Sequence, residues 1–92
     1  MRKTSKPYIM EVSMVVWLDA HADSETWVEL DSIDPEPMTI TTVGIMLPRA
    51  TKPGHVTLTQ SYSDGMCDHV IHIPERMVQS ITVLSTIPSA QE

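Results

Sequence analysis

Cysteine is almost absent from this chain of 92 residues, since it occurs only at Cys67, and phenylalanine is missing altogether. One thiol cannot form an intrachain disulfide, so packing has to hold the fold, and a lone thiol fits a reducing compartment. Apolar runs long enough to span a membrane, about 18 residues or more, are also missing. The basic N-terminal residues lead into an apolar stretch that Glu11 and Ser13 interrupt, so we expect no signal peptide. These absences predict a cytoplasmic protein.

Basic side chains are scarce, because six lysines and arginines stand against twelve acids and give a net charge of −6. No base occurs between residues 11 and 37, where eight acids lie: Glu11, Asp19, Asp23, Glu25, Glu29, Asp31, Asp34 and Glu36. Such a stretch repels nucleic-acid backbones and anionic membranes, and it suits a basic protein surface or a cation. The alternative is a solvated loop that only aids solubility. We therefore expect neither nucleic acid nor a membrane as a partner.

Alternating apolar and β-branched residues predict five strands. The strands span residues 9–17, 38–47, 55–62, 68–73 and 80–84. Gly44 interrupts the second of them, which predicts a bulge or a sharp bend. Ser63-Asp64-Gly65 is typical of a hairpin turn, and Pro74-Glu75-Arg76-Met77 is typical of one helical turn that begins with proline. The chain is thus predicted to be all-β, with one short helical turn before the last strand.

The order of these elements predicts a small five-stranded barrel of the src-homology type, to which the Sm-like fold is related. Closing the sheet would remove its unpaired edges. We expect one domain at residues 9–84, a flexible N-terminus at 1–8 and a C-terminal tail at 85–92. The long first loop, residues 18–37, is expected to contain a helical turn capped by Asp23 or Ser24. Trp27 in this loop is expected to pack back on the barrel.

The first strand is apolar on both faces. Alternation puts Met10, Val12, Met14 and Val16 on one face, and Ile9, Val15 and Trp17 on the other. A monomeric barrel buries only one such face, so the second apolar face predicts a homo-oligomer. Coverage of that face by Trp27 and the long loop is the alternative.

Two clusters contain residue types that bind metals: Asp19-x-His21-x-Asp23 and Cys67-x-His69-x-x-His72. Residues two apart share a face of a strand, so Cys67 and His69 would point together and His72 away. Metal binding stays open at both clusters, with exposed histidines as the alternative. A thiolate pair of Cys67 and His69 would lie in a turn with no visible pocket, so we expect no enzyme, no catalytic residue and no cofactor.

Beyond the N-terminal residues, the bases of the chain are Arg49, Lys52 and Arg76. Together with only four aromatic residues they are too few for a continuous nucleic-acid groove. In a symmetric oligomer, however, each base is repeated around one interface, where such side chains bind anions. We therefore predict that Arg49, Lys52 and Arg76 bind a small anionic ligand such as a nucleotide.

Three segments carry a Trp-x-Asp-Ala start, a second Trp, a Val-Gly strand and an Ile-Pro ending. They are Val15-Val-Trp-Leu-Asp-Ala-His-Ala-Asp-Ser-Glu-Thr-Trp27, Thr42-Val-Gly-Ile-Met-Leu47 and His69-Val-Ile-His-Ile-Pro-Glu-Arg-Met-Val-Gln-Ser-Ile-Thr-Val-Leu84. This pattern resembles a largely uncharacterised family of small bacteriophage-encoded accessory proteins. The resemblance implies a protein of the host cytoplasm that counters a defence by sequestering its nucleotide signal or by blocking a defence protein. A structural or assembly component of a virion and an Sm-like module for single-stranded nucleic acid are the alternatives.

Overall fold

The computed structural model describes residues 9–20, 27–33 and 35–88, which form five strands and three short 3-10 helices. The strands are β1 (Ile9–Asp19), β2 (Met38–Met46), β3 (His55–Ser63), β4 (Met66–Pro74) and β5 (Val78–Pro88). The 3-10 helices are η1 (Leu30–Ser32), η2 (Arg49–Thr51) and η3 (Glu75–Met77). The all-β class and the five strands are confirmed, and η3 is the predicted helical turn. β5 runs beyond its predicted end, because Thr86 and Ile87 continue to pair with Glu11 and Met10.

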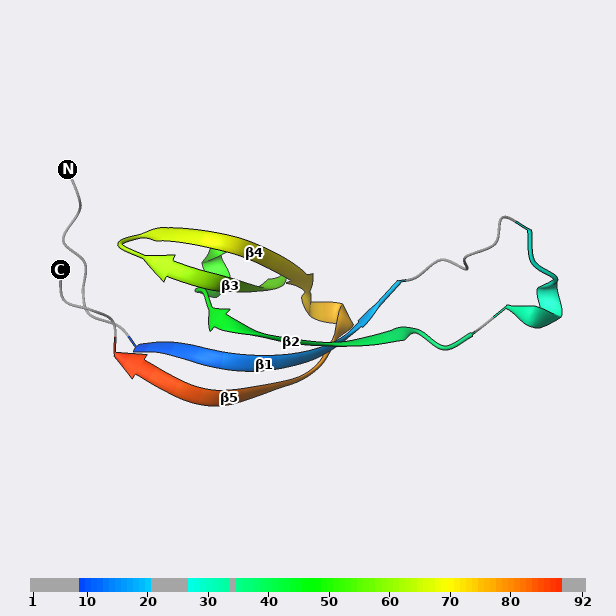
Figure 1. Cartoon of the computed structure of the whole chain (residues 1–92), viewed down its shortest axis with the longest axis horizontal. Coiled ribbons are helices and arrows are strands. Elements are labelled where there is room, and N and C mark those ends of the chain that lie inside the picture. Colours follow the sequence, from blue (N-terminus) through cyan, green and yellow to red (C-terminus); the bar gives the residue numbers. More distant parts are fainter. Residues whose placement is uncertain (1–8, 21–26, 34, 89–92) are drawn as a thin grey trace.

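All neighbouring strands are antiparallel, and their order is β4-β3-β2-β1-β5. β4 and β5 lie at the two ends of this order, so the sheet is not closed into the barrel that the sequence predicted. Only Ile45 and Met46 of β2 pair with β3, whereas every residue of β2 pairs with β1, from Glu11 to Asp19. This narrow connection lets the β3–β4 hairpin fold over one face of the β5-β1-β2 layer (Figure 1).

The core lies between that hairpin and the layer. Its buried side chains are Val15, Val56, Leu58 and Ile73, with Trp17, Met46, Ile71 and Val78 packed against them. Trp17 has the only N–H group among these side chains, and its indole Nε1–H donates a hydrogen bond of 2.9 Å to Thr42 Oγ1. The indole N–H therefore keeps a hydrogen-bond acceptor although the ring packs against the core.

Gly44 marks a close approach of two strands. A Cβ atom at this position would meet the carbonyl oxygen of Thr59 at 3.0 Å and Cβ of Leu58 at 3.2 Å. Of the bulge or sharp bend predicted at Gly44, a bulge is absent from the pairing of β2 with β1, whose register runs through Gly44 without a shift. The irregularities lie instead between β1 and β5, at Val12/Ser13 and Val16/Trp17.

The described residues between β1 and β2, namely Ala20, residues 27–33 and residues 35–37, extend beyond the end of the sheet, and we call them the arm (Figure 1). β1 and β2 stay paired up to Asp19 and Met38. The arm therefore continues in the direction of these strands and does not turn back toward the core. The prediction that Trp27 packs on the sheet is therefore wrong, because its side chain is 90% exposed. The helical turn expected at Asp23 or Ser24 lies outside the described residues. Within the described part of the chain, no helix has the length and hydrophobicity needed to cross a membrane.

Candidate functional site

Arg49, Lys52 and Arg76 lie on two turns that meet at one end of the sheet. η2 carries Arg49 and is followed by Lys52, while η3 carries Arg76. The two turns are joined through the backbone, because Glu75 N–H donates to the carbonyl of Gly54 at 3.0 Å. We call this region, residues 49–54 with 75–77, the basic end.

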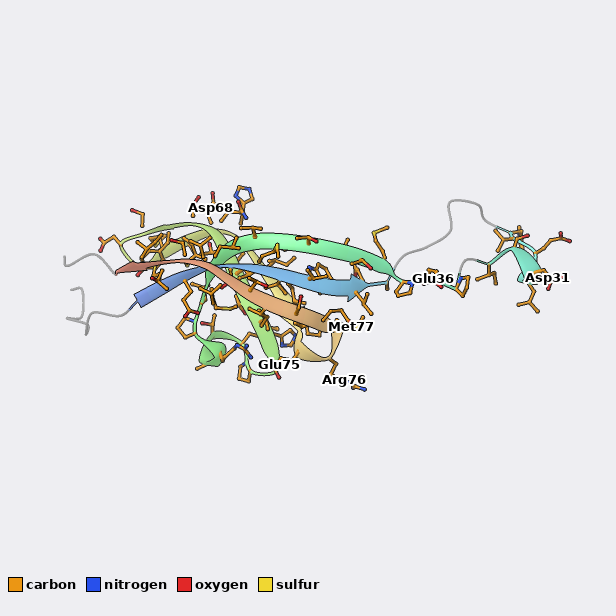
Figure 2. All side chains as sticks on the ribbon, turned by 90° about the horizontal axis from the view of Figure 1, so that it is seen from below. Asp31, Glu36, Asp68, Glu75, Arg76 and Met77 are labelled. Atoms are coloured by element: carbon orange, nitrogen blue, oxygen red, sulfur yellow. The ribbon has the colours of Figure 1, made fainter. Side chains whose placement is uncertain are left out.

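An ion pair links the two halves of the basic end. Arg49 Nη1 lies 2.9 Å from Glu75 Oε2, although the residues are 26 positions apart in sequence. Both side chains are exposed, so the pair is hydrated and contributes about 0–1 kcal/mol to stability. Glu75 cancels part of the positive charge. Arg76 points outward from η3 into solvent (Figure 2), and no described carboxylate pairs with Arg76 or Lys52.

Two histidines flank the basic end. His55 is the first residue of β3, and its Nδ1 donates to the carbonyl of Pro53 at 3.0 Å. His72 Nδ1 lies 2.9 Å from Thr57 Oγ1, and the two imidazole rings meet edge to face with centroids 6.4 Å apart. Hydrogen bonds therefore fix both rings through Nδ1. His55 also pairs with Pro74, which directly precedes Glu75, so the histidines lie beside the turn that carries the ion pair.

Neither candidate metal cluster is assembled by the described residues, among which no three histidine, cysteine or carboxylate side chains gather. Cys67 is exposed, and His69 Nδ1 contacts Asp68 Oδ2 at 3.2 Å. The argument from strand alternation fails at His69, because its φ of 57° breaks the extended backbone. Of the other cluster, Asp19 ends β1, and His21 and Asp23 lie outside the described residues.

The arm is a second surface that differs in character from the basic end. Trp27 and Leu30 are 90% and 81% exposed, so these two large apolar side chains lack cover. Asp31 and Glu36 lie along the same segment, with Asp31 at its outer part and Glu36 near β2 (Figure 2). The described part of the arm thus combines apolar and acidic side chains and has no base.

Sequence reasoning found the three bases but not Glu75 and His55 as their neighbours. Nothing in the linear spacing signals a contact over 26 residues, since it depends on how β3 pairs with β4. The one available signal is that Glu75 directly precedes Arg76 in the turn. Compared with protein-family models, with curated proteins and with solved structures, the chain shows no significant match.

Proposed function

We propose that the protein is a non-enzymatic, phage-encoded binding protein that counters a host defence by holding a small anionic, nucleotide-like ligand at the basic end. The observation that carries the proposal is the contact between the turn of residues 49–54, which carries Arg49 and Lys52, and η3, which carries Arg76, in a chain of net charge −6. The phage origin is supported by the resemblance of the Trp-x-Asp-Ala, Val-Gly and Ile-Pro segments.

The chemistry of the basic end suits phosphate. Guanidinium groups bind phosphate oxygens through two parallel N–H donors, and an ammonium group adds a compact charge. Lys52 and Arg76 have no described carboxylate to displace, whereas a ligand at Arg49 has to compete with Glu75. Exposure of all three side chains predicts an affinity that falls as salt rises.

The src-homology-type barrel and the homo-oligomer belong to the same proposal. The strand order β4-β3-β2-β1-β5 supports the relation to a src-homology-type barrel. Closure of such a barrel would require the edges of β4 and β5 to meet. Repetition of the basic end in an oligomer would multiply the charges around one ligand.

Calorimetric titration with pyrophosphate and with ATP tests the site. We expect binding by the intact protein and at least a tenfold loss of affinity in each of Arg49→Ala, Lys52→Ala and Arg76→Ala. Asp31→Asn is the matched control, since it changes one charge on the arm and leaves the basic end intact. Native mass spectrometry of protein from a phage-infected host extract then gives the mass of any retained ligand. Unchanged affinity in all three alanine variants would reject the site.

A second candidate function, blocking a basic host defence protein, is favoured by the exposed Trp27 and the acids of the arm. It predicts a complex that weakens as salt rises and is lost on Trp27→Ser. The virion-component alternative predicts co-purification with phage particles, and the Sm-like alternative predicts a mobility shift of single-stranded RNA.

A further inference from the structure

The β5-β1-β2 layer has one face that the core does not use. Side chains of directly paired residues share a face, so the register defines this outer face. It consists of Met10, Val12, Met14, Val16 and Leu18 from β1, Thr39, Thr41, Val43 and Ile45 from β2, and Ser80, Thr82, Ser85 and Ile87 from β5. None of these side chains is charged, and the apolar ones form a continuous stripe along β1.

Nothing in the described part of the chain covers the outer face. The β3–β4 hairpin packs on the opposite face (Figure 1), which contributes Val15 to the core. Val43 and Ile87 on the outer face are 43% and 45% exposed, and the apolar residues of β1 on this face are only partly buried. The arm, which was the other candidate cover, points away along the strand direction.

The chain therefore has two apolar surfaces that nothing in its described part packs against: the outer face of the sheet and the arm. Trp27, Leu30 and Ile33 on the arm are all exposed. We propose that the arm of one copy lies across the outer face of a second copy, and that the exchange is reciprocal in a two-fold symmetric dimer. Each copy then supplies the cover that its partner lacks, and the same patch is used on both sides of the two-fold axis.

The area of the two surfaces favours this occupant. From the usual strand rise and spacing, the outer face measures about 30 by 14 Å, or about 400 Å². A stable interface buries about 800 Å² on each partner, so two outer faces pressed together would fall short. A buried tryptophan adds about 200 Å², and Leu30 and Ile33 bring the sum close to the required area. Exchange of both arms thus reaches a size that the sheet faces alone do not.

The charge of the two surfaces also favours a second copy of the chain, rather than a basic partner protein, as the molecule that binds there. The outer face offers an uncharged floor for Trp27 and Leu30, while the acids Glu29, Asp31 and Glu36 remain at the rim in water. Burial of apolar area then drives the association, and salt has little effect on it. A complex between the acidic arm and a basic host surface would show the opposite salt dependence.

Sedimentation equilibrium of the full chain tests the dimer. We expect twice the chain mass of 10.3 kDa, insensitive to salt, and a single chain mass for Trp27→Ser/Leu30→Ser, whose changes touch only exposed positions. Thr41→Lys, at an exposed polar position of the outer face, should also give the monomer. Met66→Ser is the matched control, because Met66 is 72% exposed but belongs to the β3–β4 hairpin, and it should remain dimeric. Circular dichroism confirms that each variant is folded.

A position-specific cross-link then tests arm exchange itself. In a Cys67→Ser background, Leu30→Cys chains are mixed with Val43→Cys or Ile87→Cys chains and oxidised. Because every chain carries one thiol, a heterodimeric disulfide requires an arm to reach the other copy's outer face, whereas Leu30→Cys with Met66→Cys should form none. A monomer, a dimer that survives both sets of variants, or a Trp27-dependent complex with a host protein alone would overturn the proposal. The arm exchange rests on the homo-oligomer of the proposed function, whereas pyrophosphate binding at the basic end is measured separately, so failure of the dimer and failure of the anion site are distinguished.

Discussion

Gly44 and Thr59 lie so close that the carbonyl oxygen of Thr59 would stand 3.0 Å from any Cβ placed on residue 44. The obstacle is backbone, which cannot rotate away, and Cβ of Leu58 stands on the same side at 3.2 Å. We expect Gly44→Ala to lower the free energy of unfolding by about 1–3 kcal/mol, as overpacking of a tight contact does. Urea denaturation followed by circular dichroism measures this loss.

Gly65→Asn is the control for the Gly44 prediction. Gly65 has a φ of 81°, a Cβ added to it would meet no atom within 4 Å, and asparagine tolerates this backbone region. The substitution should change stability by less than about 1 kcal/mol. If Gly44→Ala lowered the free energy of unfolding no more than Gly65→Asn does, β2 and β3 would not approach each other as closely as the structure has them.

Ser13 is buried, and its hydroxyl has no hydrogen-bond partner among the described residues. A buried polar group without a partner costs the energy of its lost hydration. We therefore expect Ser13→Ala to raise the free energy of unfolding, by up to about 1 kcal/mol. Thermal denaturation should show a higher midpoint; a lower one would indicate that the hydroxyl is satisfied.

Thr59 is the opposite case, a buried hydroxyl that lies within 2.8 Å of the carbonyl of Ser61 and 2.9 Å of that of Asp68. Thr59→Val keeps the shape but leaves these two carbonyls without their donor. We expect a loss of about 1–2 kcal/mol in the same denaturation experiment. A stabilised Thr59→Val would show that the carbonyls find other donors.

Glu75 is predicted to weaken anion binding at the basic end. Glu75→Gln removes the carboxylate that holds Arg49 and keeps a similar shape. If the proposed site is correct, pyrophosphate should bind more tightly by up to about 5-fold, which corresponds to the loss of one exposed charge pair. Titration at low and at high salt measures the gain, which should shrink as salt rises. An affinity that falls would contradict this prediction and would indicate that Glu75 supports the site by holding Arg49 in position.

The strands could be predicted because their signal is local. Alternation in residues 55–62 and the Ser63-Asp64-Gly65 turn determine a hairpin between neighbours in the chain. Closure of the sheet depends on whether β4 and β5 meet, and no pattern within either strand encodes that distance. The prediction for Trp27 is wrong for a related reason. A large apolar residue in a loop suggests burial, but the pairing of Asp19 with Met38 directs Trp27 and its described neighbours away from the core.

For the candidate site, composition was enough to select Arg49, Lys52 and Arg76, because few bases exist in this part of the chain. The geometry around them was not accessible, since the contact of Arg49 with Glu75 arises from two turns that long-range strand pairing brings together. His69 shows a further limit. Its left-handed backbone interrupts β4 without a glycine, and strand periodicity cannot anticipate it.

Ile9 and Pro88, the first residue of β1 and the last residue of β5, are paired with each other. The two ends of the sheet-forming chain therefore lie side by side, at the end of the molecule opposite the arm (Figure 1). A short linker could join them and new termini could be opened within the arm, which yields a circular permutant with the same strand pairs. The scaffold would then be continuous and the arm would be two free ends, so that the arm can be changed, or tethered elsewhere, without altering what holds the protein together.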